Sequence, residues 1–296
     1  MARTMARTMS SVNQRSADID SLLGLLRDGE VLLLSGAGIS TESGIPDYRG
    51  PTGQKRESDP IQYREFVTSA AARQRYWARS AVGWPRVRAA EPNAGHTAVA
   101  ALQAAGLVTG IITQNVDGLH QAAGSRRVVE LHGSLYRAVC LQCGRLSDRD
   151  ALQSAMLAHN PGWETQQARI TPDGDAVLPQ ELIDTFRPPE CSTCGGALKP
   201  HVVLFGENVP RAVVQQAWQL LQHARMLLVV GSSLTVYSGF RFAERAAREG
   251  KPLALLNLGP TRADRLATLK IEAPIGQALQ AAAAGLSVAS THPGYR

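Results

Sequence analysis

Short runs of apolar residues are spaced along the chain, and each is followed by a Gly, Asn or Gln. We interpret them as buried strands at Val31–Ser35, Val108–Thr113, Val202–Phe205, Leu227–Val230 and Leu253–Leu256. Nearly continuous apolar strands are typical of a parallel sheet that is covered on both faces. The stretches between them have helical spacing and predict helices around Ile19–Asp28, Pro60–Val82, His96–Ala104, Ala212–His223 and Gly239–Glu249.

This alternation predicts an α/β fold, a doubly wound Rossmann-like parallel sheet, in which ligands bind at the carboxyl ends of the strands. The segment Cys140–Cys194 interrupts the pattern, because it has few apolar runs and contains both pairs of cysteines. We therefore expect a smaller zinc-binding domain inserted into the large one. The expected divisions are a flexible N-terminal tail at 1–16, a discontinuous nucleotide-binding domain at 17–137 and 200–290, the inserted domain at 138–199 and a C-terminal tail at 291–296.

Composition narrows the class of protein further. The chain has 296 residues, 44% hydrophobic and 19% charged, which is typical of a globular protein. Its longest apolar runs are far shorter than the ~20 residues of a membrane helix, so no membrane association is expected. The net charge of +6 suggests nucleic acid, but Arg3, Arg7 and Arg15 of the acid-free first 16 residues account for half of it. Because no block of like charges follows, we expect no direct contact with nucleic acid.

The first residues also bear on location. They lack the apolar core of a secretory signal, and they are very short for the Arg- and Ser-containing transit peptide that they otherwise resemble. We expect a reducing compartment, namely the cytoplasm of a bacterium or the mitochondrial matrix of a eukaryote.

Four cysteines in a reducing compartment favour metal binding over disulfides. They form two Cys-x-x-Cys-Gly segments, at Cys140 and Cys143 and at Cys191 and Cys194. Four thiolates in a tetrahedron suit Zn²⁺ and leave no open coordination position, which predicts one structural zinc. A redox-active dithiol is the alternative.

A glycine-rich turn follows the first predicted strand. The segment Gly36-Ala37-Gly38-Ile39-Ser40 would allow backbone amides to approach a pyrophosphate. However, Thr41 stands where the dinucleotide fingerprint has its third glycine, and no acidic residue follows at the expected distance. The turn alone therefore indicates either a nucleotide site or an ordinary structural turn.

Further polar motifs decide between these readings. They are the loop from Gly36 to Arg49, Thr113-Gln114-Asn115-Val116-Asp117-Gly118-Leu119-His120, Glu130-Leu131-His132-Gly133, Gly231-Ser232-Ser233 and Asn257-Leu258-Gly259. In this order, with the Cys pairs between them, they resemble the sirtuin family of NAD-dependent protein deacylases over Leu22 to Leu279. The match is closer still to the class II, mitochondrial-type sirtuins, on Asp47-Tyr48-Arg49, on the segment from Arg73 to Pro85 and on Asn257 to Arg262.

The resemblance implies a chemistry that consumes NAD. Nicotinamide leaves the ribose, the carbonyl oxygen of an acyl-lysine attacks the same carbon, and the ribose 2′-hydroxyl then attacks the resulting imidate. His132 matches the catalytic base of the family, and Asn115 and Asp117 match the residues that hold the nicotinamide end. Asp117 could alternatively cap a helix, and His120 matches no catalytic position. The implied partners are proteins or peptides with acylated lysines, whereas oligomeric state is left open.

The resemblance also implies two sets of binding residues. The cofactor would be bound by Gly36, Ala37, Gly38, Ile45, Asp47, Tyr48, Arg49, Gln114, Asn115, Asp117, Gly231, Ser232, Ser233, Asn257, Leu258, Gly259 and Ile275. An extended substrate would pair as an added strand with residues Val202, Val203, Leu204, Phe205, Gly206, Glu207, Tyr237 and Ser238. Alternatively, Val202–Phe205 is a plain strand of the sheet core, and both descriptions can hold for alternate residues of the run.

Tyr76 and Arg79 predict the acyl specificity. Their i, i+3 spacing places them on one helix face, where a phenol and a guanidinium could bind a carboxylate. A similar pair marks sirtuins that remove succinyl and glutaryl groups, so we expect a preference for acidic or longer acyl groups over acetyl. The alternative is a core tyrosine beside a solvated arginine.

Two other functions fit parts of the sequence. Protein mono-ADP-ribosyltransfer would use the same cofactor site and begin with the same loss of nicotinamide. A nucleic-acid-binding zinc protein would explain the cysteines and the charge, but it leaves the Gly36 loop, Asn115, Asp117 and His132 without a role.

Overall fold

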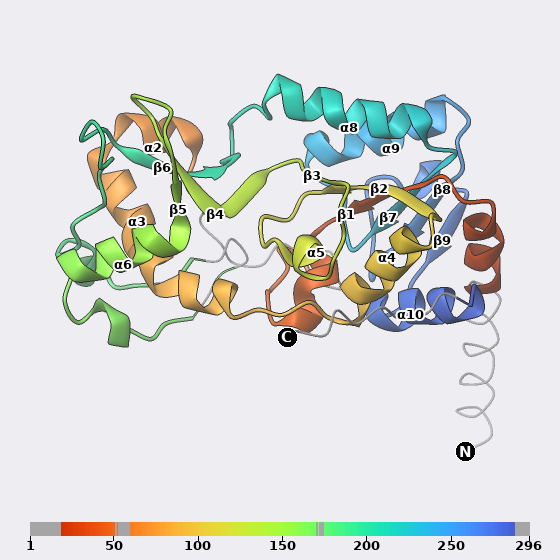
Figure 1. Ribbon diagram of the computed structural model, residues 1–296, viewed down its shortest axis with the longest axis horizontal. Helices are drawn as coiled ribbons and strands as arrows, with labels where there is room; N and C mark the ends of the chain where they lie inside the picture. Colours follow the sequence, from red (N-terminus) through yellow and green to blue (C-terminus); the bar gives the residue numbers. More distant parts are fainter. Residues whose placement is uncertain (1–18, 51, 53–59, 170, 172–174, 288–296) are drawn as a thin grey trace, which may run out of the picture.

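The computed structural model describes residues 19–50, 52, 60–169, 171 and 175–287, so the tails predicted at 1–16 and 291–296 lie outside it (Figure 1). Its larger part is built on a six-stranded parallel sheet in the order β3-β2-β1-β7-β8-β9. The strands are β1 (Val31–Ser35), β2 (Val108–Thr113), β3 (Val128–Glu130), β7 (Met226–Val230), β8 (Leu253–Leu256) and β9 (Leu269–Ile271). The chain winds outward from β1 in one direction and from β7 in the other, so the topological switch point lies between these two strands.

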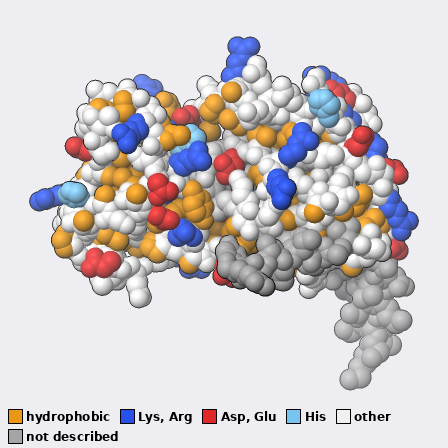
Figure 2. Space-filling view, in the orientation of Figure 1, with side chains coloured by type: hydrophobic (Ala, Val, Ile, Leu, Met, Phe, Trp, Pro, Cys, Tyr) orange, Lys and Arg blue, Asp and Glu red, His pale blue; other side chains and the backbone are white. Residues whose placement is uncertain are grey.

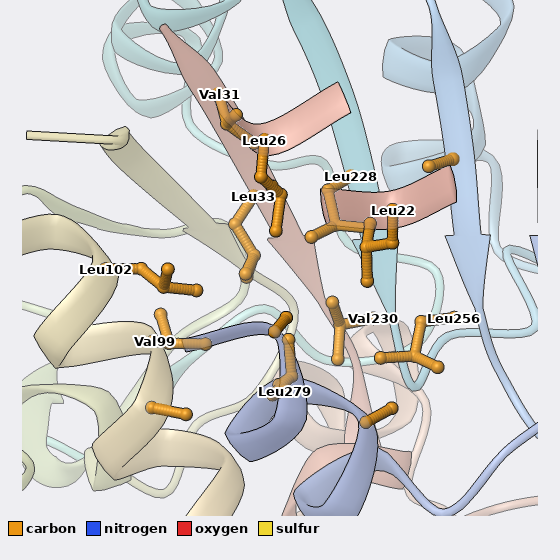
Figure 3. Packing of buried hydrophobic residues seen from close by; sticks show 14 of the residues in the cluster. Leu22, Leu26, Val31, Leu33, Val99, Leu102, Leu228, Val230, Leu256 and Leu279 are labelled. Carbon is orange, nitrogen blue, oxygen red and sulfur yellow. The ribbon is translucent and has the colours of Figure 1, made fainter. Parts of the chain in front are cut away.

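Helices cover both faces of this sheet. The helix at residues 19–27, α4 (Ala94–Ala104) and α10 (Ile275–Gly285) pack on one face, and α8 (Arg211–His223) and α9 (Tyr237–Arg248) on the other. Figure 3 shows the first of these interfaces, with labelled side chains Leu22, Leu26, Val31, Leu33, Val99, Leu102, Leu228, Val230, Leu256 and Leu279. Burial of β1 and β7 from both sides explains their apolar sequences and confirms the doubly wound α/β prediction.

The smaller part contains a three-stranded antiparallel sheet in the order β5-β4-β6. These strands are β4 (Gly133–Cys140), β5 (Leu146–Asp148) and β6 (Leu198–Val202), and α6 (Arg149–His159) and α7 (Gln180–Ile183) lie in the segment between β5 and β6. Its hydrophobic cluster also contains side chains of α2 (Tyr63–Thr68) and α3 (Ala70–Arg88), which we had assigned to the large domain. The 138–199 boundary therefore stays a proposal for the inserted segment, while the packed core extends beyond it.

The predicted strand at Val202–Phe205 is wrong. β6 ends at Val202, and the run continues into a turn in which Leu204 N donates to the Glu207 carboxylate at 2.9 Å and Gly206 has a φ of 80°. Phe205 is 41% exposed, whereas Leu204 is 8% exposed and belongs to the hydrophobic cluster of the smaller part, so the run contributes both to a surface and to a core.

The single helix predicted at Pro60–Val82 is two helices. Ser69 is extended and its hydroxyl accepts from Ala72 N at 3.2 Å, which ends α2 and begins α3. The strands β3 and β9 were missed because three residues are too few to show a periodicity. Short elements that pattern reading also missed are η1 (Ala37–Ser43), α5 (Leu119–Ala122), η2 (Trp163–Thr165) and η3 (Asp264–Leu266).

Candidate active site

A cavity of about 530 Å³ opens at the switch point, between the carboxyl ends of the parallel strands and the smaller part. Most of the predicted binding residues line it. These are Gly36, Ala37, Gly38, Ile45, Asp47, Tyr48, Arg49, Tyr76, Gln114, Asn115, Asp117, His132, Val202, Val203, Leu204, Phe205, Gly206, Glu207, Gly231, Ser232, Ser233, Tyr237, Ser238, Asn257 and Leu258. Gly259, Ile275 and Arg79 do not line it, although Leu258 and Pro260 beside Gly259 do.

Two glycine turns meet at the switch point with their backbones in contact. Gly36 N donates to Val230 O at 3.0 Å, and Gly38 N donates to Gly231 O at 2.8 Å. A Cβ on Gly38 would lie 2.8 Å from Gly231 Cα, which is closer than real Cβ atoms come. The absence of side chains therefore allows the two strand ends to form one continuous cradle, as a bound diphosphate requires.

Asn115 and Asp117 belong to one buried network below this cradle. The Asn115 amide donates to Gly36 O at 3.2 Å and to Ser40 Oγ at 3.1 Å, and Ser40 Oγ donates to Asp117 Oδ2 at 2.7 Å. Asp117 Oδ1 also accepts from Leu119 N, the first residue of α5, at 3.0 Å, although the N-cap position of this helix is Gly118 and not Asp117. Burial raises the pKa of Asp117, against these hydrogen bonds. Ser40 was missed from the sequence because serine in a glycine-rich turn is unremarkable by itself.

His132 lies in the turn between β3 and β4 and faces the cavity. Its Nδ1 is 3.0 Å from Gln114 O, and its Nε2 is 2.8 Å from Ser238 Oγ. Because a carbonyl oxygen can only accept, Nδ1 carries the proton and Nε2 is left as the basic atom. Burial and the charge of Arg241 lower the pKa of His132, while the bond to Gln114 opposes them. The imidazole is therefore neutral at pH 7, as a general base must be.

His120 has a different environment. Its Nε2 is 2.8 Å from Ser35 Oγ, its ring packs edge-on against His96 at 5.1 Å, and it does not line the cavity. Burial, with a smaller effect of His96, lowers the pKa of His120 to about 3. This histidine belongs to the core behind the cavity.

The predicted peptide-binding residues form the two sides of the cavity mouth. Phe205, Val236 and Tyr237 are exposed, at 41%, 47% and 56%. Val203 N donates to His132 O at 2.8 Å, which ties the first side to the histidine turn. The buried ammonium of Lys199 is 2.9 Å from the Glu207 carboxylate, which holds the turn after β6 in place.

The two predicted acyl-binding residues lie in different surroundings. Tyr76 is buried and lines the cavity, whereas the Arg79 guanidinium donates through Nε to Ala176 O at 3.0 Å. The same nitrogen is 3.9 Å from the Asp175 carboxylate, and Asp175 also lines the cavity. Asp175 and the cavity-lining Arg241 were missed, because nothing near them in the sequence indicates that they reach the cavity.

The four cysteines form a site of their own in the smaller part. Their Sγ atoms all lie within 4.8 Å of one another, with Cys140 and Cys194 at 3.6 Å and Cys143 and Cys191 at 3.7 Å. Sulfurs at a Zn–S distance of ~2.3 Å in a tetrahedron are about 3.8 Å apart, so this donor set fits one zinc ion. None of the four lines the cavity, which fits a structural role.

Together the fold and the cavity define a class: a Rossmann-like nucleotide-binding protein with a neutral histidine at its switch point. Residues 36–238 match the Sir2 family. This chain therefore belongs to the Sir2 family, the sirtuins.

Similar proteins agree with this assignment. NAD-dependent protein deacetylase 1 of Streptomyces coelicolor is 54% identical over 264 residues, covering 89% of this chain and 88% of that protein. NAD-dependent protein deacetylase 1 of Mycobacterium avium is 48% identical over 281 residues, covering 93% of this chain and 98% of that protein. A solved structure of Sir2 with a p53 peptide and NAD+ is 30% identical, with a TM-score of 0.72 over 91% of this chain and 98% of that one. A solved structure of Sir2 bound to an acetylated peptide is 29% identical, with a TM-score of 0.72 over 92% of this chain and 99% of that one.

Proposed function

We propose that this protein is an NAD-dependent protein-lysine deacylase, which transfers the acyl group to ADP-ribose and releases nicotinamide. The observation that carries the proposal is that His132, held through Nδ1 by Gln114 O, lines the same cavity as the paired glycine turns. The names of the bacterial relatives, NAD-dependent protein deacetylases, support the same activity.

Different residues of the cavity would bind the cofactor and act on the substrate. NAD, when bound, supplies a ribose carbon that nicotinamide can leave and a hydroxyl that can attack the acyl carbon. The turns at Gly36–Gly38 and Gly231–Ser232 line the cavity, and their lack of side chains at Gly36, Gly38 and Gly231 would let the diphosphate come close to the backbone. Asn115 and Asp117 are held by Ser40 at the closed end and would bind the nicotinamide and its ribose. His132 would take the proton of the attacking hydroxyl at Nε2.

The substrate would enter as an extended peptide. Residues 202–207 and 236–238 flank the cavity mouth, and strand addition between them binds mainly through the main chain. This arrangement favours a loose preference for peptide sequence, so we propose acylated-lysine proteins in general as partners.

The proposed location is the bacterial cytoplasm, because four thiolate ligands need a reducing compartment. Among the described residues, no helix combines the length and apolar character needed to cross a bilayer.

A peptide panel with NAD tests the activity. Acetyl-, glutaryl- and methylglutaryl-lysine peptides are incubated with the protein, and free lysine peptide, nicotinamide and acyl-ADP-ribose are quantified by mass spectrometry. His132→Ala is expected to lose at least about 100-fold in kcat/KM for every peptide, since it removes the base. Gain of ADP-ribose on protein without loss of acyl would support mono-ADP-ribosyltransfer instead, and retained activity in His132→Ala would contradict the proposed mechanism.

A further inference from the structure

The first turn of α9 reaches the histidine of the proposed mechanism. Ser238, the second residue of α9, is 2.8 Å from His132 Nε2 through its hydroxyl. Since Nδ1 of His132 donates to Gln114 O, Nε2 has a lone pair and the serine hydroxyl is the donor. The atom that would accept the substrate proton is thus already engaged by a side chain of the protein.

Packing around the next residue places this turn. Gly239 lies against the Gln114 side chain so closely that a Cβ would be 2.5 Å from Nε2 of that amide. Gln114 Oε1 in turn accepts from Ser232 Oγ at 2.6 Å. Gln114 thereby binds His132 through its backbone carbonyl and contacts the start of α9 through its side chain. These contacts bring the start of α9 against the residue that also binds the His132 ring.

We propose that Ser238 is a positioning residue, whose hydroxyl occupies His132 Nε2 in the free protein, holds the ring as the Nδ1–H tautomer and yields its place to a substrate hydroxyl. The role rests on the proposed function, in which Nε2 is the base. No covalent step is involved, because the hydroxyl of Ser238 is exchanged for another hydroxyl at the same nitrogen.

The charges around the ring bear on how this contact can be measured. Arg241, one turn further along α9, donates to Ser238 O at 3.1 Å, and its charge disfavours a protonated His132. Asp117 after β2, Glu207 after β6, and Asp47 and Arg49 after η1 line the same cavity. Variants at Ser238 leave all of these groups in place, so a change in the titration of His132 reports the hydroxyl itself.

An NMR titration of the free protein tests the contact. The histidine ring signals of the intact chain are followed against pH, and His132 is identified from the signal lost in His132→Gln. A hydroxyl that donates to Nε2 stabilises the neutral ring, so Ser238→Ala is expected to raise the pKa of His132 by about 0.5–1 unit. Ser238→Thr keeps the hydroxyl and is expected to titrate as the wild type does, and Ser238→Cys, a weak donor, between the two.

Kinetics then test the exchange. The acid limb of kcat/KM reports the free enzyme, and that of kcat reports the substrate complex. Ser238→Ala should therefore shift the acid limb of kcat/KM to higher pH and leave the acid limb of kcat unchanged. An unchanged His132 titration in Ser238→Ala, at a wild-type melting temperature, would overturn the proposal, as would equal shifts of both limbs. If Ser238→Ala does not fold, a wild-type titration in Ser238→Cys overturns it. Lack of deacylation by the wild type would instead defeat the proposed function, because the NMR result requires no turnover.

Discussion

At the scale of single residues, the polar side chains of the cavity have partners before any ligand binds. Hydrogen bonds run from Asn115 to Ser40 and from Ser40 to Asp117, and both nitrogens of His132 are engaged. Side chains held in this way lose little freedom on binding, which favours a preorganised site.

Acyl specificity is a prediction at this scale. Arg79 Nε and the Asp175 carboxylate are 3.9 Å apart, so Asp175 would compete with an acidic acyl group for the same guanidinium. We expect Arg79→Ala to lower the ratio of glutaryl to acetyl kcat/KM by about tenfold, since it removes a charge-assisted hydrogen bond. Asp175→Asn is expected to raise the same ratio.

Both ratios come from the peptide panel, and Arg187→Ala, at an exposed arginine of the inserted segment, provides the control. If Arg79→Ala leaves the ratios of all three acyl groups unchanged, Arg79 does not bind the acyl group and the preference for acidic acyl groups is unsupported.

At the scale of elements, the junction of β1 and β7 depends on residues without side chains. Gly38→Ala is expected to lower the free energy of unfolding by about 1–3 kcal/mol and to raise the KM for NAD, because the new methyl group meets the backbone of Gly231. Urea unfolding and steady-state kinetics measure the two effects.

Gly24→Ala is the matched control for this junction. Gly24 is an exposed residue of the helix at 19–27, and nothing lies within 4 Å of its would-be Cβ. There alanine should stabilise the protein by about 0.5–1 kcal/mol. Equal KM values for NAD in both variants would argue against the cradle.

The smaller part is expected to depend on zinc. Cys140 and Cys191 belong both to its hydrophobic cluster and to the four-cysteine site, so loss of the metal should loosen the cluster as well. We expect about one zinc per chain in reduced protein, and a chelator should remove it together with the peptide-dependent activity. Cys143→Ser should reduce zinc content, whereas Ser192→Ala, which keeps all four thiolates, should not. Below about 0.2 zinc per chain in freshly reduced protein, the structural-zinc assignment would fail.

At the scale of the whole molecule, two buried histidines make stability depend on pH. Burial lowers the pKa of His96 to about 4, and burial together with His96 lowers that of His120 to about 3. Unfolded chains protonate such imidazoles below about pH 6.5, so the unfolded state binds more protons and stability falls as the pH drops from 6.5 towards 4.

Urea unfolding at pH 7.5 and pH 5 measures this effect. Each histidine is expected to cost about 1–2 kcal/mol at the lower pH. His120→Gln cannot titrate and should reduce the difference, whereas His223→Gln, on an exposed position of α8, should not. A pH-independent free energy of unfolding over this range would contradict the expectation.

Charge is also a property of the whole molecule. Figure 2 shows acidic and basic side chains interspersed over the visible face. The net charge of +6 is therefore a weak guide to partners, since half of it lies in the first 16 residues, outside the described structure.

Local sequence was sufficient for features that short segments specify alone. The bounds of β1, β2 and β8 follow from apolar runs buried on both faces, and α4 and α8 were placed to within two residues. The cysteine pairs also specify their ligand geometry within each Cys-x-x-Cys turn. The family resemblance identified most residues of the cavity, because its motifs are long and occur in a specific order.

Only the tertiary structure decided which distant side chains meet. Ser238 and His132 are 106 residues apart in the chain, and Arg79 of α3 reaches Asp175 in the loop before α7. The run after Val202 has the composition of a buried strand, yet it lines an open cavity. Sequence patterns record local conformation and average burial, whereas these contacts depend on how the inserted segment and α9 pack against the sheet.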